Sequence, residues 1–158
     1  MPQNLTTILA TWFGIGRLKP APGSWGSLAA LPLAWLSWSL LSGPLGVLLA
    51  ALAVTLLGIW SAEAYRKAIG REDPSEVVID EVAGQLLTLA VVPPDFLAYG
   101  IGFLFFRGFD ILKPGPIGWA DRHVKGGLGI MLDDLLAGLV AGALLLALGK
   151  GTGWWMTI

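Results

Sequence analysis

The distribution of charged residues constrains this chain more than any other feature. Residues 20–62 carry no charge at all. All but two of the 10 basic and 11 acidic residues fall into three short groups, which span residues 17–19, 63–81 and 107–134. Charged residues make up only 13% of the chain, against about 25% in a typical soluble domain. Such a composition argues against an ordinary soluble globule, and its 55% hydrophobic content argues against a disordered chain.

Turn-forming residues divide the apolar segments that separate these charged groups. Ser42-Gly43-Pro44 splits the first segment, and Val92-Pro93-Pro94-Asp95 splits the second, which leaves two apolar hairpins and one further apolar stretch at 135–149. A hairpin returns the chain to the side that it left, so the three charged groups face one side and Asp95 and Lys150 face the other. The first side holds nine of the ten Lys and Arg residues, which the positive-inside rule identifies as cytoplasmic.

We therefore expect an all-α fold, a small polytopic membrane helical bundle formed by residues 1–158 as a single domain. It has about five apolar helices, a short N-terminal helix within residues 1–13, and charged loops on the cytoplasmic face. A span needs about 20 residues, so some helices must include charged positions. One such helix is expected to begin near Pro74-Ser75, a second to cover residues 96–112, and a third to begin near Ile130. We interpret Trp154 and Trp155 as interfacial anchors on the far side. A soluble, very hydrophobic helical bundle is the alternative.

Pairs of ionisable residues are expected on three of these helices: Asp80 with Glu81, Arg107 with Asp110, and Asp133 with Asp134. Ionisable groups at membrane depth are costly and usually functional. Gly84 and Gly138 follow Asp80 and Asp134 by four residues, so each glycine shares a helix face with its aspartate and lets another helix approach. Both aspartates are therefore expected to point inward, and Glu76 is expected on the same face as Asp80.

Inward carboxylates repel one another and need cations nearby. Arg107, Lys113 and Lys125 are candidates, as is a hard metal ion with oxygen ligands such as Mg²⁺. For any single carboxylate, an ordinary ion-pair network at a helix end is the alternative.

Two glycine-containing segments, residues 19–27 and 125–129, precede apolar helices. Free backbone N–H groups at a helix N-terminus suit an anion such as phosphate. The simpler interpretation of the first segment is a turn in which Ser24 or Ser27 is the N-cap. Neither segment matches a Walker A loop or a dinucleotide-binding fingerprint.

The composition excludes several classes of chemistry. The chain has no Cys and one His, which excludes a disulfide framework, a cysteine nucleophile and any site that needs two histidines. His123 lies in a charged segment, where a lone histidine is more often a surface residue than a catalyst. The net charge of −1 argues against a nucleic-acid partner. Carboxylates, basic residues and glycine loops on one face favour phosphate chemistry at a membrane surface.

Three stretches together resemble the phosphatidylglycerophosphatase A family. They are GIGRLKPAPGSWGSLAALPL at 14–33, DPSEVVIDEVAGQ at 73–85, and FRGFDILKPGPIGWADRHVKGGLGIMLDDLLAGLVAG at 106–142. The resemblance implies an all-helical enzyme of the bacterial cytoplasmic (inner) membrane, with its active site on the cytoplasmic face. Such an enzyme hydrolyses phosphatidylglycerophosphate to phosphatidylglycerol and phosphate, with Mg²⁺, in phospholipid biosynthesis. Family members often have Thr where this chain has Ser24 and Ser27, which keeps the hydroxyl.

The resemblance also implies roles for particular residues. The acidic motif residues, expected to be catalytic, are Asp80, Glu81, Asp110, Asp133 and Asp134. The basic and loop residues of the family motifs are Lys19, Pro22, Gly23, Gly26, Arg107, Lys113 and Lys125. Our hypothesis assigns Mg²⁺ to Asp80, Glu81, Asp133 and Asp134. It assigns the substrate phosphate to Lys19, Gly23, Ser24, Gly26, Arg107, Lys113, Lys125, Gly126 and Gly127.

Several alternatives stay open at this stage. Attack on the phosphate by a water molecule is expected, and a covalent aspartyl-phosphate route through Asp80 or Asp110 is the other mechanism. A non-enzymatic membrane carrier would place its carboxylates near the middle of the membrane rather than at one end. A soluble metal-dependent phosphatase of the same superfamily is the third alternative, and extraction behaviour distinguishes it from a membrane enzyme. The sequence does not indicate an oligomeric state.

Overall fold

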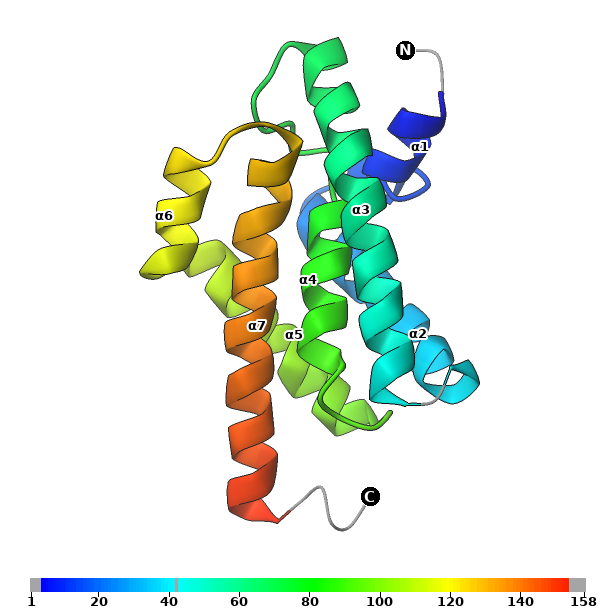
Figure 1. Ribbon diagram of the computed structural model, residues 1–158, viewed down its shortest axis with the longest axis vertical. Helices are drawn as coiled ribbons and strands as arrows, with labels where there is room; N and C mark the ends of the chain where they lie inside the picture. The colour runs from blue at the N-terminus through cyan, green and yellow to red at the C-terminus, as the bar shows by residue number, and fades with distance from the viewer. Residues whose placement is uncertain (1–3, 42, 154–158) are drawn as a thin grey trace.

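A computed structural model describes residues 4–41 and 43–153 of the chain. Within these ranges the fold consists of seven α-helices and one 3₁₀ turn, without a strand, which confirms the all-α prediction (Figure 1). The elements are α1 (Leu5–Ala10), the 3₁₀ turn Ile15–Arg17, α2 (Pro22–Leu40), α3 (Pro44–Ile69), α4 (Ile79–Leu89), α5 (Phe96–Leu112), α6 (Pro116–His123) and α7 (Gly126–Thr152). Trp154 and Trp155, expected to be interfacial anchors, lie outside the described residues.

Local chemistry accounts for most of the helix ends. A proline occupies the first turn of α2, α3 and α6, where its missing N–H has no intrahelical partner to lose. The Asp95 side chain caps α5 by accepting a hydrogen bond of 2.7 Å from the backbone N–H of Ala98. Gly70 ends α3 in the left-handed conformation, and Lys113 ends α5 in the same conformation just before Pro114.

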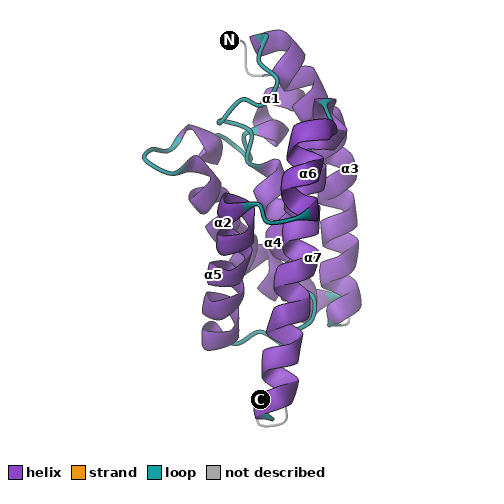
Figure 2. Ribbon diagram, turned by 90° about the vertical axis from the view of Figure 1, so that its left-hand side faces the viewer, coloured by secondary structure: helices purple, strands orange, loops and turns teal. Residues whose placement is uncertain are grey.

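Helix α4 forms the centre of the bundle. It packs against α2, α3, α5 and α7, and the views in Figures 1 and 2 agree in placing it among them. Most of its residues are buried, including Ile79, Val82, Leu86 and Leu89. This helix is therefore the core element that carries Asp80 into the interior of the protein.

Helices α4 and α7 approach each other closely at two glycines. A Cβ atom added to Gly138 of α7 would collide with the backbone carbonyl of Gly84 in α4. The Thr88 hydroxyl donates to the carbonyl oxygens of Gly84 and Gly138, at 3.1 and 3.3 Å. This confirms the close helix approach predicted from the spacing of the two glycines and the two aspartates.

The two ends of the bundle differ in charge. The α2–α3 turn, the α4–α5 turn and the end of α7 lie at one end, and the α3–α4 loop, α6 and the start of α7 lie toward the other (Figure 1). Asp95 and Lys150 belong to the first set of elements, as expected from the two apolar hairpins. We call the second set the charged end, because residues 63–81 and 107–134 supply most of the ionisable groups of the chain.

The start of α4 differs from the sequence-based expectation. The helix begins at Ile79, not near Pro74-Ser75, and Val78 precedes it as its cap. The backbone N–H of Val78 donates to the carbonyl of Ala10 at 3.0 Å, and the Val78 side chain packs against Gly26. These tertiary contacts hold the segment before Ile79 outside the helix, so Glu76 does not share a helix face with Asp80.

The start of α7 and the segment before it were also predicted incorrectly. Helix α7 begins at Gly126, not near Ile130, because the glycines form its first turn and the N–H of Gly127 donates to Glu63 of α3 at 2.7 Å. The segment expected to be a charged loop around His123 is helical and forms α6. The His123 ring stacks on Trp119 one turn earlier, at a ring-centroid distance of 5.2 Å.

Two helices, α3 and α7, are long and apolar enough to cross a membrane. Helices α4 and α5 contain 11 and 17 residues, fewer than the roughly 20 that a perpendicular span needs. Large apolar side chains are exposed along α3, including Leu45, Leu49, Leu52 and Leu56. An exposed leucine surface of this kind is typical of proteins that contact lipid or a partner.

Candidate functional site

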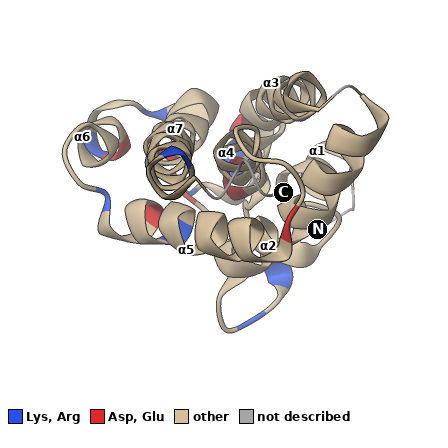
Figure 3. Ribbon diagram, turned by 90° about the horizontal axis from the view of Figure 1, so that it is seen from below, with Lys and Arg blue, Asp and Glu red and all other residues tan. Residues whose placement is uncertain are grey.

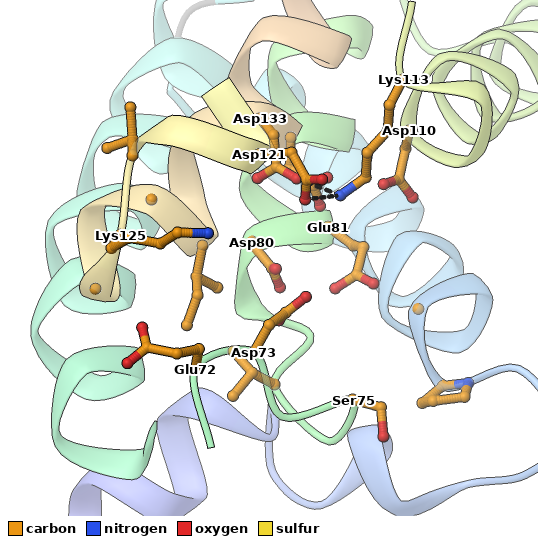
Figure 4. A pocket seen from close by; sticks show the side chains of 18 of the residues that line it. Glu72, Asp73, Ser75, Asp80, Glu81, Asp110, Lys113, Asp121, Lys125 and Asp133 are labelled. Carbon is orange, nitrogen blue, oxygen red and sulfur yellow. Dashed lines mark hydrogen bonds and ion pairs between the residues drawn. The ribbon is translucent and has the colours of Figure 1, made fainter. Parts of the chain in front are cut away.

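A cavity of about 280 Å³ lies at the charged end, where five helices and one loop meet (Figure 4). The first turns of α2, α4 and α7, the end of α5, α6, and the α3–α4 loop all contribute residues to its wall. Its ionisable lining residues are Glu72, Asp73, Asp80, Glu81, Arg107, Asp110, Lys113, Asp121, Lys125, Asp133 and Asp134. Segments far apart in the sequence thus bring most of the predicted site residues into one cavity.

Three carboxylates in the wall of this cavity form a tight cluster. Asp80, Glu81 and Asp134 each offer an oxygen atom within 4.8 Å of the others. Asp134 is 3% exposed, and each of the three carboxylates keeps one buried oxygen that has no hydrogen-bond partner among the described residues. Buried carboxylates this close together repel one another unless a positive charge lies between them. The donor set consists of hard anionic oxygens, so these three residues fit a divalent cation.

Arg107 occupies the boundary between this acidic cluster and α5. Its guanidinium pairs with Asp110 one turn along the same helix, and its Nη1 lies 3.8 Å from Oε1 of Glu81. The Nε atom of Arg107 has no hydrogen-bond partner in the described part of the chain. Arg107 is therefore a partly buried cation with one donor, Nε, that no described residue uses.

Lys113 bridges two carboxylates on the other side of the cavity (Figure 4). Its Nζ donates to Oδ1 of Asp121 at 2.5 Å and to Oδ2 of Asp133 at 2.6 Å. Partial burial lowers the pKa of Lys113, but the two carboxylates outweigh this and leave the pKa above its ordinary value. Lys113 therefore stays charged at neutral pH. Figure 4 shows Lys125 on the opposite side of the cavity from Lys113.

Gly23 brings the start of α2 into contact with the acidic cluster. A Cβ atom at this position would collide with the Glu81 carboxylate and would lie 3.1 Å from Nη1 of Arg107. The glycine therefore lets the first turn of α2, with its free N–H groups, lie beside these two side chains without displacing them.

The cavity contains some of the predicted phosphate-binding residues but not others. Gly23, Arg107, Lys113, Lys125 and Gly126 line it, as do all five acidic residues that the sequence predicted to be catalytic. Four residues lie outside it: Lys19, Ser24, Gly26 and Gly127.

Packing explains the positions of these four residues. Gly26 faces Val78, and the N–H of Gly127 is bound to Glu63. Ser24 lies inside the first turns of α2, and Lys19 is an exposed residue in the loop before that helix. Neither Ser24 nor Ser27 caps α2, because Ala21 is its N-cap and the Ser27 hydroxyl donates to the carbonyl of Gly23.

Asp133 does not belong to the cluster formed by the other three predicted metal ligands. Its Oδ2 is held by Lys113, and the group of mutually close carboxylates comprises Asp80, Glu81 and Asp134 without it. The structure therefore pairs one member of the Asp133-Asp134 dipeptide with a cation from the protein and directs the other toward the acidic cluster.

Four polar lining residues were not among the predicted site residues: Glu72, Asp73, Ser75 and Asp121. Asp121 lies on α6, a helix in a segment that was expected to be a loop. Its spacing of eight residues from Lys113 gave no periodic signal. Asp73 and Ser75 lie where α4 was expected to begin and Glu72 just precedes them, and all three line the cavity from the loop before α4.

The fold and the cavity together define the class of protein. Long apolar helices surround a site in which buried carboxylates suited to a divalent cation lie beside basic side chains, a combination typical of phosphate chemistry. The chain belongs to the phosphatidylglycerophosphatase A family, whose sequence pattern matches residues 8–149.

Similar proteins support this assignment. A protein named phosphatidylglycerophosphatase A in Escherichia coli is 38% identical over 93% of this chain and 85% of its own length. A protein of the same name in Haemophilus influenzae is 39% identical over 87% of this chain and 85% of its own length. A Bacteroides thetaiotaomicron protein, provisionally named a phosphatidylinositol-3-phosphatase, is 40% identical over 87% of this chain and 89% of its own length. No solved structure gives a significant match.

Proposed function

We propose that the protein hydrolyses the terminal phosphate monoester of phosphatidylglycerophosphate to give phosphatidylglycerol and inorganic phosphate, as a step of phospholipid biosynthesis. Membership of the family and the names of the Escherichia coli and Haemophilus influenzae relatives support this substrate. The observation that carries the proposal is the cavity in which Asp80, Glu81 and Asp134 lie beside Arg107 and Lys113.

The basic residues bind the phosphate in this proposal. Arg107 offers its unpaired Nε, Lys125 lies across the cavity, and the first turn of α2 presents N–H groups at Gly23. Lys113 holds Asp133 and Asp121, which fixes one wall of the cavity and adds positive charge. Phosphoryl transfer depends chiefly on positioning and on neutralising charge, and these residues provide both.

We assign a divalent cation, with Mg²⁺ as the specific proposal, to Asp80, Glu81 and Asp134. When bound, such a cation neutralises charge on the phosphoryl oxygens and lowers the pKa of a coordinated water molecule. The unpaired buried oxygens of these three carboxylates support the assignment. Asp133 contributes through Lys113 instead of as a ligand.

The acidic residues also account for proton transfer. A water molecule attacks phosphorus in line with the leaving oxygen, a carboxylate that is not bound to the cation accepts the proton of that water, and the proton then passes to the leaving glycerol oxygen to give the alcohol. Asp110 and Asp133 line the cavity and are the candidates for this base. Hydrolysis of a substrate with an isotopically chiral phosphorothioate separates direct attack from the aspartyl-phosphate route, because one in-line attack by water inverts the configuration at phosphorus and two in-line displacements retain it.

We propose that the protein is a multi-pass protein of the bacterial cytoplasmic membrane, with the charged end in the cytoplasm. The two long apolar helices α3 and α7 support membrane insertion. Helices α2 and α5 complete the bundle as shorter or tilted spans, while α4 is largely surrounded by the other helices and contacts little lipid. The membrane then holds the acyl chains of the substrate while the phosphate reaches the cavity.

Phosphate release by the purified protein in detergent tests the proposed function. Wild-type protein is expected to release phosphate from phosphatidylglycerophosphate with Mg²⁺ and not with EDTA. Asp80→Asn and Asp134→Asn each remove a negative charge from the proposed cation site and are expected to lower kcat at least about a hundredfold. Phosphatidylinositol 3-phosphate is the comparison substrate, because the name of the Bacteroides relative points to it.

Asp95→Asn is the matched control for these two variants. It makes the same chemical change at the opposite end of the bundle, and asparagine caps a helix as well as aspartate does. Its activity is expected to equal that of the wild type. Unchanged activity of Asp80→Asn and Asp134→Asn, or a preference for phosphatidylinositol 3-phosphate, would contradict the proposal.

A further inference from the structure

An apolar groove of about 650 Å³ lies between α2 and α5, separate from the catalytic cavity. Its principal lining residues are Leu31, Trp35 and Leu36 of α2 and Phe96, Tyr99 and Gly100 of α5. The Trp35 ring contacts the rings of Phe96 and Tyr99, with centroid distances of 5.2 and 5.7 Å. Aromatic side chains thus join the two helices within an otherwise open groove.

The same two helices line both the groove and the catalytic cavity. Gly23 near the start of α2 and Arg107 near the end of α5 belong to the cavity, and the groove lies further along each helix. At 1.5 Å per residue, Leu31 lies about 12 Å along α2 from Gly23, and Gly100 lies about 10 Å along α5 from Arg107. The two helices therefore place the groove at the same depth below the phosphate-binding residues.

This depth suits the lipid part of a phospholipid whose terminal phosphate occupies the cavity. The groove continues along α2 to Ser39, about 24 Å from Gly23. Between Leu31 and Ser39 the groove is about 12 Å long, which is most of the roughly 15 Å thickness of one leaflet of the hydrocarbon core. An acyl chain lying along the α2–α5 groove would therefore be accommodated over most of its length.

Tyr99 adds a polar group at the level where the apolar chain begins. Its side chain is 3% exposed, and its hydroxyl has no hydrogen-bond partner among the described residues. A buried hydroxyl without a partner is costly. Tyr99 lies about 12 Å along α5 from Arg107. An ester carbonyl of the lipid, which separates the headgroup from the acyl chain, is an acceptor of the right chemistry for this hydroxyl.

We infer that the α2–α5 groove binds one acyl chain of the phospholipid substrate whose phosphate lies in the catalytic cavity. This inference rests on the proposed function, because it assigns the lipid part of that same substrate. The groove selects substrates with a long apolar chain attached to the phosphate-bearing headgroup. It also orients the headgroup, since the chain and the phosphate are held on the same pair of helices.

Gly100→Leu tests the inference without disturbing the fold. A Cβ atom at Gly100 meets nothing within 4 Å, so a leucine there fills groove space without a collision. Gly151→Leu is the matched control, because its Cβ position is equally open and Gly151 lines neither the groove nor the cavity. For diacyl phosphatidylglycerophosphate, kcat/KM of Gly100→Leu is expected to fall about tenfold, mainly through KM. Gly151→Leu should match the wild type.

Photolabelling provides a readout that does not require turnover. The probe is phosphatidylglycerophosphate with a diazirine midway along one acyl chain, irradiated with the protein in detergent and mapped by mass spectrometry. Labels are expected within residues 31–39 and 96–100, and an excess of unlabelled phosphatidylglycerophosphate should remove them while phosphatidylcholine should not. Gly100→Leu should reduce this labelling about tenfold, and Gly151→Leu should not change it.

The two readouts separate the groove from the proposed activity. Labelling of the groove that phosphatidylglycerophosphate displaces would support the inference even if the wild type released no phosphate, and the proposed function alone would then be wrong. Labels spread along the exposed leucines of α3, labelling unchanged in Gly100→Leu, or labels displaced equally by phosphatidylcholine would overturn the inference.

Discussion

At the scale of single residues, the balance of charge around Asp80, Glu81 and Asp134 governs the site. The nearest protein cation to this cluster in the described residues is Arg107, which lies 3.8 Å from Glu81 and is already paired with Asp110. Lys113 is likewise shared between Asp121 and Asp133. Neither cation is free to leave its partner for the cluster, because breaking a buried ion pair typically costs about 3–5 kcal/mol. The cluster therefore has more negative charge than its basic neighbours balance, and the proposed cation would supply the difference.

The pKa of Glu76 indicates how the stability of the fold changes in acid. Partial burial raises the pKa of Glu76, but hydrogen bonds of 2.7 and 2.8 Å from Arg71 outweigh this, so its pKa lies below the ordinary value. A lowered folded-state pKa stabilises the fold above the unfolded-state pKa, and this contribution disappears as the pH falls through the folded-state pKa. Between pH 6 and pH 3 the free energy of unfolding should therefore fall less in Glu76→Gln than in the wild type, by about 0.5 kcal/mol. Thermal unfolding in detergent measures this difference. An identical acid slope in both proteins would contradict this.

The sequence predicted the acidic cluster of the cavity better than the loop residues around it. Adjacent carboxylates on apolar helices are unusual enough to be identified without a structure, and Asp80, Glu81 and Asp134 do lie together. Lys19 and Gly127 share the residue types and loop positions of true lining residues, but Lys19 is exposed outside the cavity and the N–H of Gly127 is bound to Glu63. Asp121 was missed because its contact with Lys113 depends on how α6 folds back, which no local pattern indicates.

At the scale of elements, the contact between α4 and α7 positions the site. Gly138 lies one turn after Asp134, and its backbone touches that of Gly84, one turn after Asp80. The close approach of these two helices therefore fixes the separation of the two aspartates. A side chain at either glycine would push the helices apart and would move the carboxylates with them.

Gly138→Ala is expected to lower both stability and activity. The added methyl group collides with the carbonyl of Gly84 and should destabilise the protein by about 1–3 kcal/mol, measured by thermal unfolding in detergent. Phosphate release should fall as well, since Asp134 shifts away from Asp80. Gly151→Ala, at an open helical position, should be neutral or slightly stabilising because alanine favours a helix. Equal stability of the two variants would show that the α4–α7 contact is not tight.

Hydropathy and turn residues predicted the helices but not all of their boundaries. The end of α5 at Leu112 and the turn before α3 follow from Pro114 and Pro44, which act locally. The start of α4 depends instead on the contacts of Val78 with Ala10 and Gly26, which are remote in sequence. The start of α7 within its glycines similarly depends on Glu63 of α3.

At the scale of the whole molecule, charged residues are scarce, as the mostly tan ribbon of Figure 3 shows, and their distribution predicts the orientation of the protein in the membrane. The charged end carries the catalytic cavity, and only Asp95 and Lys150 of the ionisable residues belong to the opposite end. The chain contains no cysteine, so single-cysteine variants report topology without a background. Lys150→Cys and Arg122→Cys place one thiol at each end of the bundle.

A membrane-impermeant maleimide should label Lys150→Cys in bacterial cells whose outer membrane has been removed and whose cytoplasmic membrane is intact. It should label Arg122→Cys only after the cytoplasmic membrane has been opened, because the positive-inside rule places the charged end in the cytoplasm. The reverse pattern would contradict the proposed orientation. Release of the protein into buffer without detergent would contradict membrane insertion itself.

The central claim is that Asp80, Glu81 and Asp134 hold the cation on which phosphate release depends, and titration calorimetry of purified protein with Mg²⁺ tests it most directly. The wild type is expected to bind Mg²⁺ with saturation that parallels the rise of phosphatase activity over the same concentrations. Asp80→Asn and Asp134→Asn should lose both the binding heat and the activity, and Asp95→Asn should keep both. Wild-type Mg²⁺ binding by Asp80→Asn and Asp134→Asn, or full phosphate release by the wild type in EDTA, would contradict the claim.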